Sequence, residues 1–337
     1  MKDIIKSIIS YPETHSLREL VEKGLDKDYR PRIPEGVLAF NIMQPLIMVL
    51  QRLKVISLKA YEAFITDKLV ARNGNDGVDS HNLISALCEL SVMNAFIAAS
   101  EQPESFFYEP RLIERSKKNV EFSIIVGGLL YEVEVKSANM INHAEALDKN
   151  MRKEGQVIEP NSRMIPVEEW KAIAGETPLM LSLDNKVADF LSSAQEKFPP
   201  IENSIHLLVI CWDGRYRKAL TALKSETSGL MTANTYRPDL GYDHISHIVV
   251  TSQYGFVINW LQGGLPPVYA QDPLNLRFAY NFLMDYNLDK PDDIHERLVG
   301  IFGCQELPVV DEKYVDRYCE DAAFTINLPL RNRLSRD

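Results

Sequence analysis

The chain has 337 residues, of which 45% are hydrophobic and 25% are charged, and its formal net charge is -10 at pH 7. A chain of this length buries a substantial core and divides into two or three domains. Phosphate binding is driven largely by Lys and Arg, so the acidic excess argues against nonspecific coating of nucleic acid, although it permits a local basic groove. We find no apolar run of the length that spans a bilayer and expect no membrane partner.

The N-terminus and the cysteines bear on location. Charges interrupt the short apolar stretch in residues 1–6 and no small-residue cleavage site follows, so we expect no signal peptide and a cytoplasmic location. The four cysteines have no paired spacing, which predicts reduced thiols rather than a disulfide framework or a zinc knuckle.

Residues 1–76 are predicted to form an N-terminal helical region. Residues 16–19 have the form of a capping box, and Gly24 is placed to end the helix that it starts. Residues 36–69 have a helical period and predict one or two packed helices. The Asn-Gly-Asn-Asp-Gly sequence at 73–77 predicts a linker.

Residues 77–215 are predicted to form an α/β core. Its expected elements are a helix (79–99), three strands (106–113, 120–126 and 129–137), a second helix (184–198) and a buried strand (205–212). A polar insertion at about 138–182, with loop and short helix, separates the third strand from the second helix. Residues 216–337 read as a C-terminal α/β extension with a strand at 245–252 and a helix at 274–286.

A hairpin in the middle of the core carries charges on one face. Gly127-Gly128 between two β-branched runs favours a two-residue turn with positive φ. Counting back from this turn puts Glu121 directly opposite Glu134. Because side chains alternate along a strand, one face carries all of the polar residues, namely Glu121, Ser123, Glu132, Glu134 and Lys136.

Like charges opposite each other destabilise a strand pair, so this face needs an explanation. Either it is a wet face of an antiparallel sheet, or its carboxylates bind a divalent cation through hard oxygen ligands. Glu89 raises the same question, since its neighbours three and four residues away on the first core helix are small or apolar. It reaches water at the edge of the apolar stripe or, if the helix packs over the hairpin, reaches the same metal region.

In this order of elements and acidic residues, the chain resembles the PD-(D/E)xK nuclease superfamily, whose restriction-endonuclease-like core has a mixed central sheet flanked by helices. The resemblance covers about residues 79–212. Glu121 stands where that family has its first acid, Glu134-Val135-Lys136 where it has its acidic-x-Lys motif, and Glu89 where many members have a helical Glu. Val120 and Glu121 replace the family's Pro and Asp, which puts the metal geometry in question.

The resemblance implies a metal-dependent phosphodiester hydrolase. In such a site, Glu121, Glu134 and the Val135 carbonyl would hold Mg²⁺ or Mn²⁺, and Glu89 would be a further ligand or support the first ones. Lys136 would orient the attacking water and stabilise the transition state electrostatically.

The helix after the insertion also offers polar groups, and some members of the family use a Gln or Lys there. Among Lys186, Ser193, Gln195 and Lys197 we select Gln195, against the alternative that these residues form an ordinary solvated helix face. The insertion at 138–182 could wrap the substrate or mediate assembly of a homo-oligomer.

Three hypotheses follow from the sequence. The first is a Mg²⁺-dependent endonuclease acting on nucleic acid, with DNA preferred over RNA. The second is a catalytically inactive nuclease-like fold that serves as a nucleic-acid-binding or assembly subunit. The third is an unrelated α/β protein in which the charged hairpin is only a wet sheet face.

Overall fold

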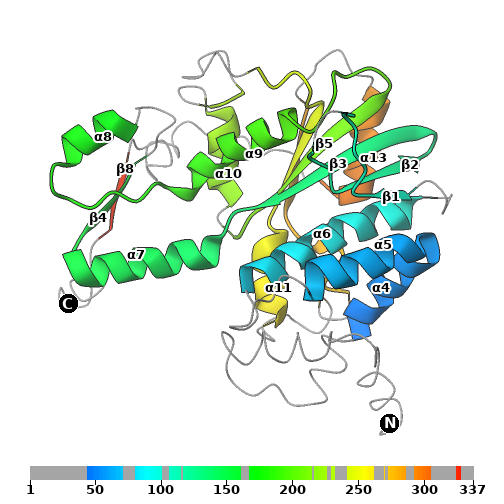
Figure 1. The fold of residues 1–337 in the computed structure, drawn as a ribbon, viewed down its shortest axis with the longest axis horizontal. Helices are drawn as coiled ribbons and strands as arrows, with labels where there is room; N and C mark the ends of the chain where they lie inside the picture. Colours follow the sequence, from blue (N-terminus) through cyan, green and yellow to red (C-terminus); the bar gives the residue numbers. More distant parts are fainter. Residues whose placement is uncertain are drawn as a thin grey trace, which may run out of the picture. The chain divides into compact units, whose positions relative to one another are not determined.

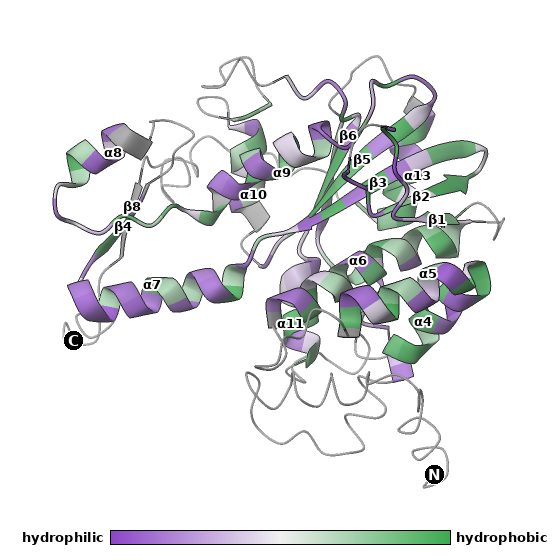
Figure 2. Cartoon of the chain, viewed as in Figure 1, coloured by the Kyte–Doolittle hydropathy of each residue, from purple (hydrophilic) through white to green (hydrophobic). Residues whose placement is uncertain are grey.

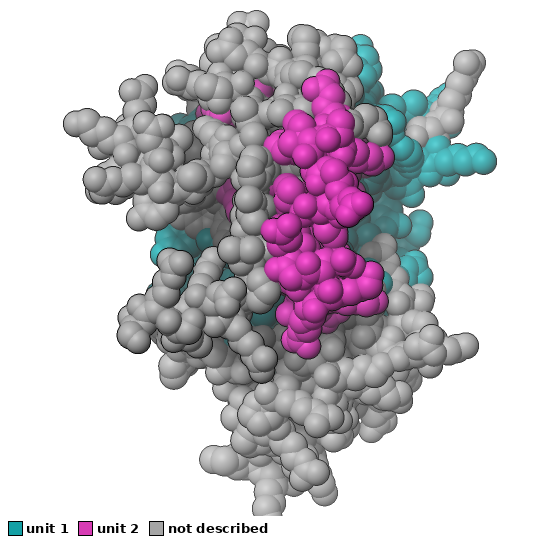
Figure 3. Space-filling model, turned by 90° about the vertical axis from the view of Figure 1, so that its left-hand side faces the viewer, with its two compact units in different colours: residues 1–137, 194–214, 243–306 teal, residues 138–193, 215–242, 307–337 magenta. Residues whose placement is uncertain are grey.

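The computed structural model describes residues 44–70, 80–100, 106–114, 117–160, 167–214, 216–225, 229–231, 241–261, 269, 272–285, 292–304 and 324–327 (Figure 1). The predicted capping box at 16–19, its Gly24 end and the linker at 73–77 lie outside these residues. The chain forms two compact units, coloured separately in Figure 3. Unit 1 comprises Met1–Ser137, Ala194–Gly214 and Asp243–Glu306, and unit 2 comprises Ala138–Ser193, Arg215–Tyr242 and Leu307–Asp337.

Unit 1 contains a six-stranded mixed sheet. Its strands, in spatial order, are β1 (Phe106–Tyr108), β2 (Phe122–Val126), β3 (Leu129–Ser137), β5 (Ser204–Cys211), β6 (His247–Thr251) and β7 (Asn281–Asp285). The first three strands form an antiparallel meander, β3, β5 and β6 run parallel, and β7 is antiparallel to β6. The predicted α/β class with a mixed sheet flanked by helices is therefore confirmed. Strands β6 and β7, from the predicted C-terminal extension, belong to the same sheet as the predicted core.

The central strands consist mostly of apolar residues because both of their faces are covered. All residues of β6, and all but the first residue of β5, are buried. These two strands appear mainly green in Figure 2, which colours each residue by hydropathy. Parallel strands buried on both faces have this nearly continuous apolar character.

The hairpin adopts the predicted turn and register. Gly127 and Gly128 have φ of +56° and +81°, a conformation that favours glycine at both positions. Val126 pairs with Leu129 and Phe122 with Val133, as counted back from the turn, and the described β2–β3 pairing ends there. The Glu121 amide also donates to the Val133 carbonyl, at 3.0 Å, so the backbone bonding at Glu121 is offset by one residue from the register counted back from the turn.

Helix α6 (Ser80–Ala99) is the central helix of unit 1 and confirms the predicted first core helix. Its Phe96 ring lies 5.6 Å from the ring of Phe122 and 5.3 Å from that of Tyr131, so the helix covers the apolar face of the hairpin. Among the described residues, His81–Ala99 is one helix long and apolar enough to cross a membrane, but 72% of that window is buried within the structure. Such burial is typical of a core helix.

The other helices of unit 1 come from both ends of the chain. They are α4 (Gln44–Ile56), α5 (Leu58–Ala63), the π-helical η2 (Phe64–Val70), α11 (Gln253–Leu261), the 3-10 turn η5 (Leu276–Phe278) and α13 (Asp292–Phe302). The predicted helical stretch at 36–69 is confirmed for its described part, which begins at Gln44.

Two strand and helix predictions in unit 1 were wrong. The first predicted strand (106–113) ends at Tyr108, because Glu109 adopts φ +46° and turns the chain. The predicted helix at 274–286 is instead the short turn η5 followed by strand β7. The local apolar spacing is compatible with a helix, but pairing of β7 along β6 decides the outcome.

The insertion contains more regular structure than a loop with a short helix. Unit 2 holds α7 (Met140–Glu154), β4 (Val157–Pro160), α8 (Val167–Ala174), η4 (Leu183–Asn185), most of α9 (Lys186–Gln195), α10 (Tyr216–Lys224) and β8 (Phe324–Asn327). Strand β4 pairs with β8 in an antiparallel ladder, so residues at 157–160 and 324–327 come together although far apart in sequence. That pairing could not be read from the local polar composition.

Candidate active site

The charged face of the hairpin is buried. The exposed fractions of Ser123, Glu132 and Glu134 are 4%, 7% and 0%. Glu132 lies 2.8 Å from Nε2 of His206, which stacks on the Phe198 ring with centroids 4.8 Å apart. The interpretation of this face as a wet sheet surface was therefore wrong, because these carboxylates are shielded from water and contact basic side chains.

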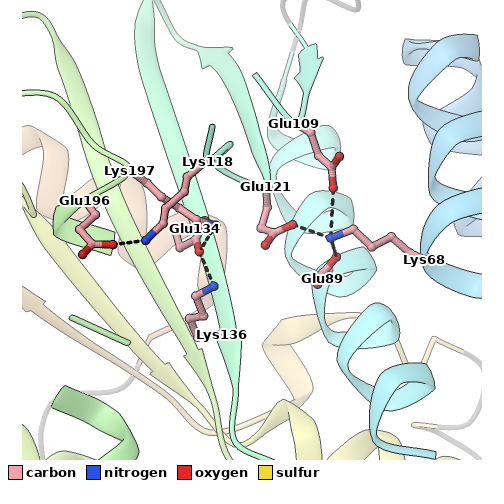
Figure 4. Close-up of polar contacts among 9 residues, drawn as sticks. All are labelled: Lys68, Glu89, Glu109, Lys118, Glu121, Glu134, Lys136, Glu196 and Lys197. Atoms are coloured by element: carbon pink, nitrogen blue, oxygen red, sulfur yellow. Dashed lines mark hydrogen bonds and ion pairs between the residues drawn. The ribbon is translucent and has the colours of Figure 1, made fainter. Parts of the chain in front are cut away.

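Lys68 lies at the centre of three carboxylates (Figure 4). Its Nζ lies 2.8 Å from Oε2 of Glu121, 3.1 Å from Oε2 of Glu89 and 3.2 Å from Oε1 of Glu109. Helix η2 supplies the lysine, α6 supplies Glu89, and the two other acids lie just outside β1 and β2. Glu89 therefore does not reach water at the edge of the apolar stripe. Its basic partner is Lys68, which comes from another helix.

Glu134 forms the second charged cluster (Figure 4). Its Oε1 lies 2.6 Å from Nζ of Lys136 and 2.5 Å from Nζ of Lys197. The residue is fully buried, and its Oε2 is a buried oxygen with no hydrogen-bond partner within the described part of the chain. A buried carboxylate oxygen in this state normally has a partner, so it marks a place where a cation or a water would fit.

The pKa values of the Glu121 and Glu134 carboxyl groups are shifted in opposite directions. Burial opposes the ionisation of Glu121, but the Lys68 ammonium and its hydrogen bond lower the pKa of that carboxyl below its ordinary value. Burial raises the pKa of Glu134 and outweighs the opposing effect of Lys136, while the Glu121 carboxylate raises it further. Glu121 is thus held ionised, whereas Glu134 is stabilised less well as an anion.

The same carboxylates raise the pKa values of Lys136 and Lys68. Burial by itself lowers the pKa of Lys136, but three carboxylates raise it, and the net shift is upward. Those three are Glu134, Glu121 and Glu89. The four charged residues that the sequence singled out therefore lie within electrostatic reach of one another. For Lys68, burial is again outweighed, by Glu89 and Glu121, and its pKa is raised well above the ordinary value.

The Val135 carbonyl has the direction that its predicted role requires. The Val133 carbonyl accepts from the Glu121 amide, so it points toward the β2 side of β3. Successive carbonyls alternate along a strand, and the Val135 carbonyl therefore points to the same side, beyond the last described pair with β2.

Gln195 has a different place from the one predicted. Its Nε2 donates to Oδ1 of Asp243 at 2.6 Å, and its Oε1 accepts from the His244 amide at 3.0 Å. These bonds tie the end of α9 to the turn that leads into β6. Lys197, two residues further on, is the side chain that contacts Glu134.

Sequence reasoning missed Lys68 and Glu109, and it preferred Gln195 to Lys197. Lys68 and Glu121 are 53 residues apart, and no spacing rule connects them. Glu109 is, within the described residues, the non-glycine residue with positive φ, which nothing in its local sequence signals. Their grouping around one ammonium becomes visible only when the helices and the sheet are assembled.

The residues present fit one divalent cation at Glu134. Among the described residues, no three His, Cys, Asp or Glu side chains are grouped so as to hold a metal ion. A magnesium site does not need such a group, because Mg²⁺ is usually held by one or two carboxylates plus waters and substrate phosphates. The open Oε2 of Glu134 and the carbonyl direction of Val135 supply hard oxygens of this kind.

Comparison of this chain with protein-family models, with curated proteins and with solved structures found no match.

Proposed function

We propose that this chain is a Mg²⁺- or Mn²⁺-dependent nuclease that hydrolyses phosphodiester bonds, with DNA as the preferred substrate. The observation that carries the proposal is Glu134. It is fully buried beside two lysines and keeps one oxygen without a hydrogen-bond partner among the described residues.

The succession of elements supports the same proposal. Helix α6, the meander β1–β2–β3, helix α9 and strand β5 parallel to β3 follow the order of the restriction-endonuclease-like core. The sheet order β1-β2-β3-β5 is compatible with that core as well. We propose that this part of unit 1, with α9, is such a core and that β6 and β7 extend it.

Each charged residue has a role in this proposal. Glu121, Glu134 and the Val135 carbonyl would hold the ion, which when bound supplies a water of lowered pKa and stabilises negative charge on phosphoryl oxygens. Lys136 orients the attacking water and places a positive charge where the transition state gains negative charge. Lys197 hydrogen-bonds Oε1 of Glu134 and so fixes the direction of Oε2.

A second candidate function is a catalytically inactive nuclease-like subunit that binds nucleic acid or assembles with a partner. The observation that favours it is Lys68, whose ammonium already neutralises part of the acidic cluster. The longer Glu121 in place of the family's Asp favours it too.

Cleavage of supercoiled plasmid, linear duplex DNA and a single-stranded RNA distinguishes these functions. The nuclease should cut DNA with Mg²⁺ or Mn²⁺ and stop when EDTA is added. Glu134→Gln should abolish cutting, whereas Glu196→Gln, in a surface ion pair with 59% of the Glu196 side chain exposed, should not. Binding without cleavage across both metals and all three substrates would refute the nuclease and support the inactive subunit.

A further inference from the structure

The Lys68 cluster has more negative charge than an ion pair needs. One ammonium lies within 3.2 Å of three carboxylate oxygens from three different glutamates. The exposed fractions of the Lys68, Glu89, Glu121 and Glu109 side chains are 5%, 10%, 13% and 35%. Burying like charges together is unfavourable, and a single carboxylate would pair the lysine. The arrangement therefore places three carboxylates around a single positive charge.

The backbone on two sides of the cluster departs from regular geometry. Lys68 lies on the π-helical η2, a conformation that is rare and is often found at functional sites. Glu109 adopts φ +46°, which is uncommon for a residue with a side chain and persists only where the surroundings enforce it. The hydroxyl of Tyr108, next to Glu109, is buried with no hydrogen-bond partner in the described chain. Two irregular segments thus bring Lys68 and Glu109 together.

We propose that the Lys68 ammonium takes the place of a divalent cation between Glu89, Glu109 and Glu121. The inference deepens the proposed function and rests on it for the metal at Glu134. In that site the chain holds a single divalent ion, and Lys68 supplies the second positive centre as a fixed part of the protein.

Lys68 then acts as a positioning residue. Its Nζ holds Oε2 of Glu121 at 2.8 Å and so fixes the direction of that carboxylate.

Counting bound Mn²⁺ tests the inference. Equilibrium dialysis with electron paramagnetic resonance detection of free Mn²⁺ gives the number of ions per chain for the wild type and for Lys68→Met. Removing the ammonium leaves three carboxylates around the position that Nζ occupied, so Lys68→Met should bind one ion more than the wild type. An unchanged count would overturn the inference.

Two controls sharpen the count. The double variant Lys68→Met, Glu89→Gln lacks the same ammonium but also one carboxylate, and it should lose the added ion or bind it at least tenfold more weakly. Lys118→Met, which removes an exposed lysine paired with Glu196, should leave the count at the wild-type value.

The outcomes for the inference and for the proposed function are separable. One ion in the wild type and two in Lys68→Met support both. No ion in the wild type and one in Lys68→Met support the inference and refute the metal-dependent nuclease. Two ions in the wild type overturn the inference and leave the nuclease standing.

The variant also has a folding readout. Without the ammonium, the largely buried Glu89 and Glu121 carboxylates lose their common partner, which is destabilising. Lys68→Met should therefore melt well below the wild type, and Mn²⁺ should restore its melting temperature more than it raises that of the wild type. Lys68→Gln is the second variant, with an amide that can still donate to one carboxylate. If both fail to fold even with Mn²⁺ present, the lysine is not replaceable by a divalent ion and the inference is wrong.

Discussion

Lys136→Ala separates catalysis from stability at the candidate site. In the folded protein, Lys136 shares Oε1 of Glu134 with Lys197, at 2.6 and 2.5 Å respectively. Removing one of the two ammonium groups leaves the buried carboxylate with a charged partner. The variant should therefore lose a catalytic group without leaving an isolated buried charge.

The magnitudes follow from this geometry. A hydrogen bond to a charged group contributes about 1.5–3 kcal/mol, and we expect Lys136→Ala to cost about 2 kcal/mol of unfolding free energy. Since a folded domain has roughly 5–15 kcal/mol, the variant stays folded. Loss of one positioned electrostatic group reduces the cutting rate by a factor of about 10²–10³.

Plasmid nicking with Mg²⁺, measured beside urea unfolding, checks both numbers. Lys118→Ala is the matched control, because its ion pair with Glu196 is exposed on both sides, at 52% and 59%, and such pairs contribute little. It should change neither stability nor cutting. Wild-type cutting by folded Lys136→Ala would refute the catalytic role of this lysine.

Three further predictions concern single positions. Because the pKa of Glu121 is lowered by Lys68, its ionisation stabilises the folded state above the ordinary pKa of a glutamate, and this stability is lost as the pH falls. Urea unfolding between about pH 3 and 6 should show a shallower pH dependence for Glu121→Gln than for the wild type, with a slope difference of up to about 1.4 kcal/mol per pH unit. Gln195→Ala should lower the melting temperature by removing the bonds to Asp243, while the cutting rate per folded molecule stays unchanged; a specific loss of rate would restore Gln195 as a site residue. Gly128→Ala, at φ +81° with open space around the added methyl, should cost about 1 kcal/mol in unfolding free energy, and no cost would contradict the turn geometry.

The parts of the site that the sequence predicted correctly depend on local signals. The Gly127-Gly128 turn fixes the register by itself, since its backbone twist matches two-residue hairpins. Alternation of side chains then determines that Glu121 and Glu134 share a face. Helix α6 is equally local, because its long apolar run follows residues that can cap a helix and ends before the helix-breaking polar stretch at 101–104.

The parts that the sequence could not predict depend on pairing between distant segments. Strand β7 was read as a helix because its apolar residues are compatible with both periods, and only the neighbouring β6 decides between them. The solvent interpretation of the hairpin failed for the same reason. Whether a polar face is wet depends on what covers it, and Lys197 and Phe198, which lie on that side, come about 60 residues later in the chain.

The pairing of Glu89 with Lys68 can be inferred from the sequence by an argument about burial. Glu89 in an apolar helix stripe requires a cationic partner, because an unpaired buried carboxylate is strongly destabilising. Its own helix offers none, so the partner has to come from another buried apolar face. In the described part of the N-terminal helices, Lys54 and Lys59 are exposed, whereas Lys68 lies beside the buried Leu69. A lysine inside one apolar stripe and a glutamate inside another are each costly alone, and the sequence can therefore require their pairing even though the three-carboxylate geometry around Nζ needs the folded chain.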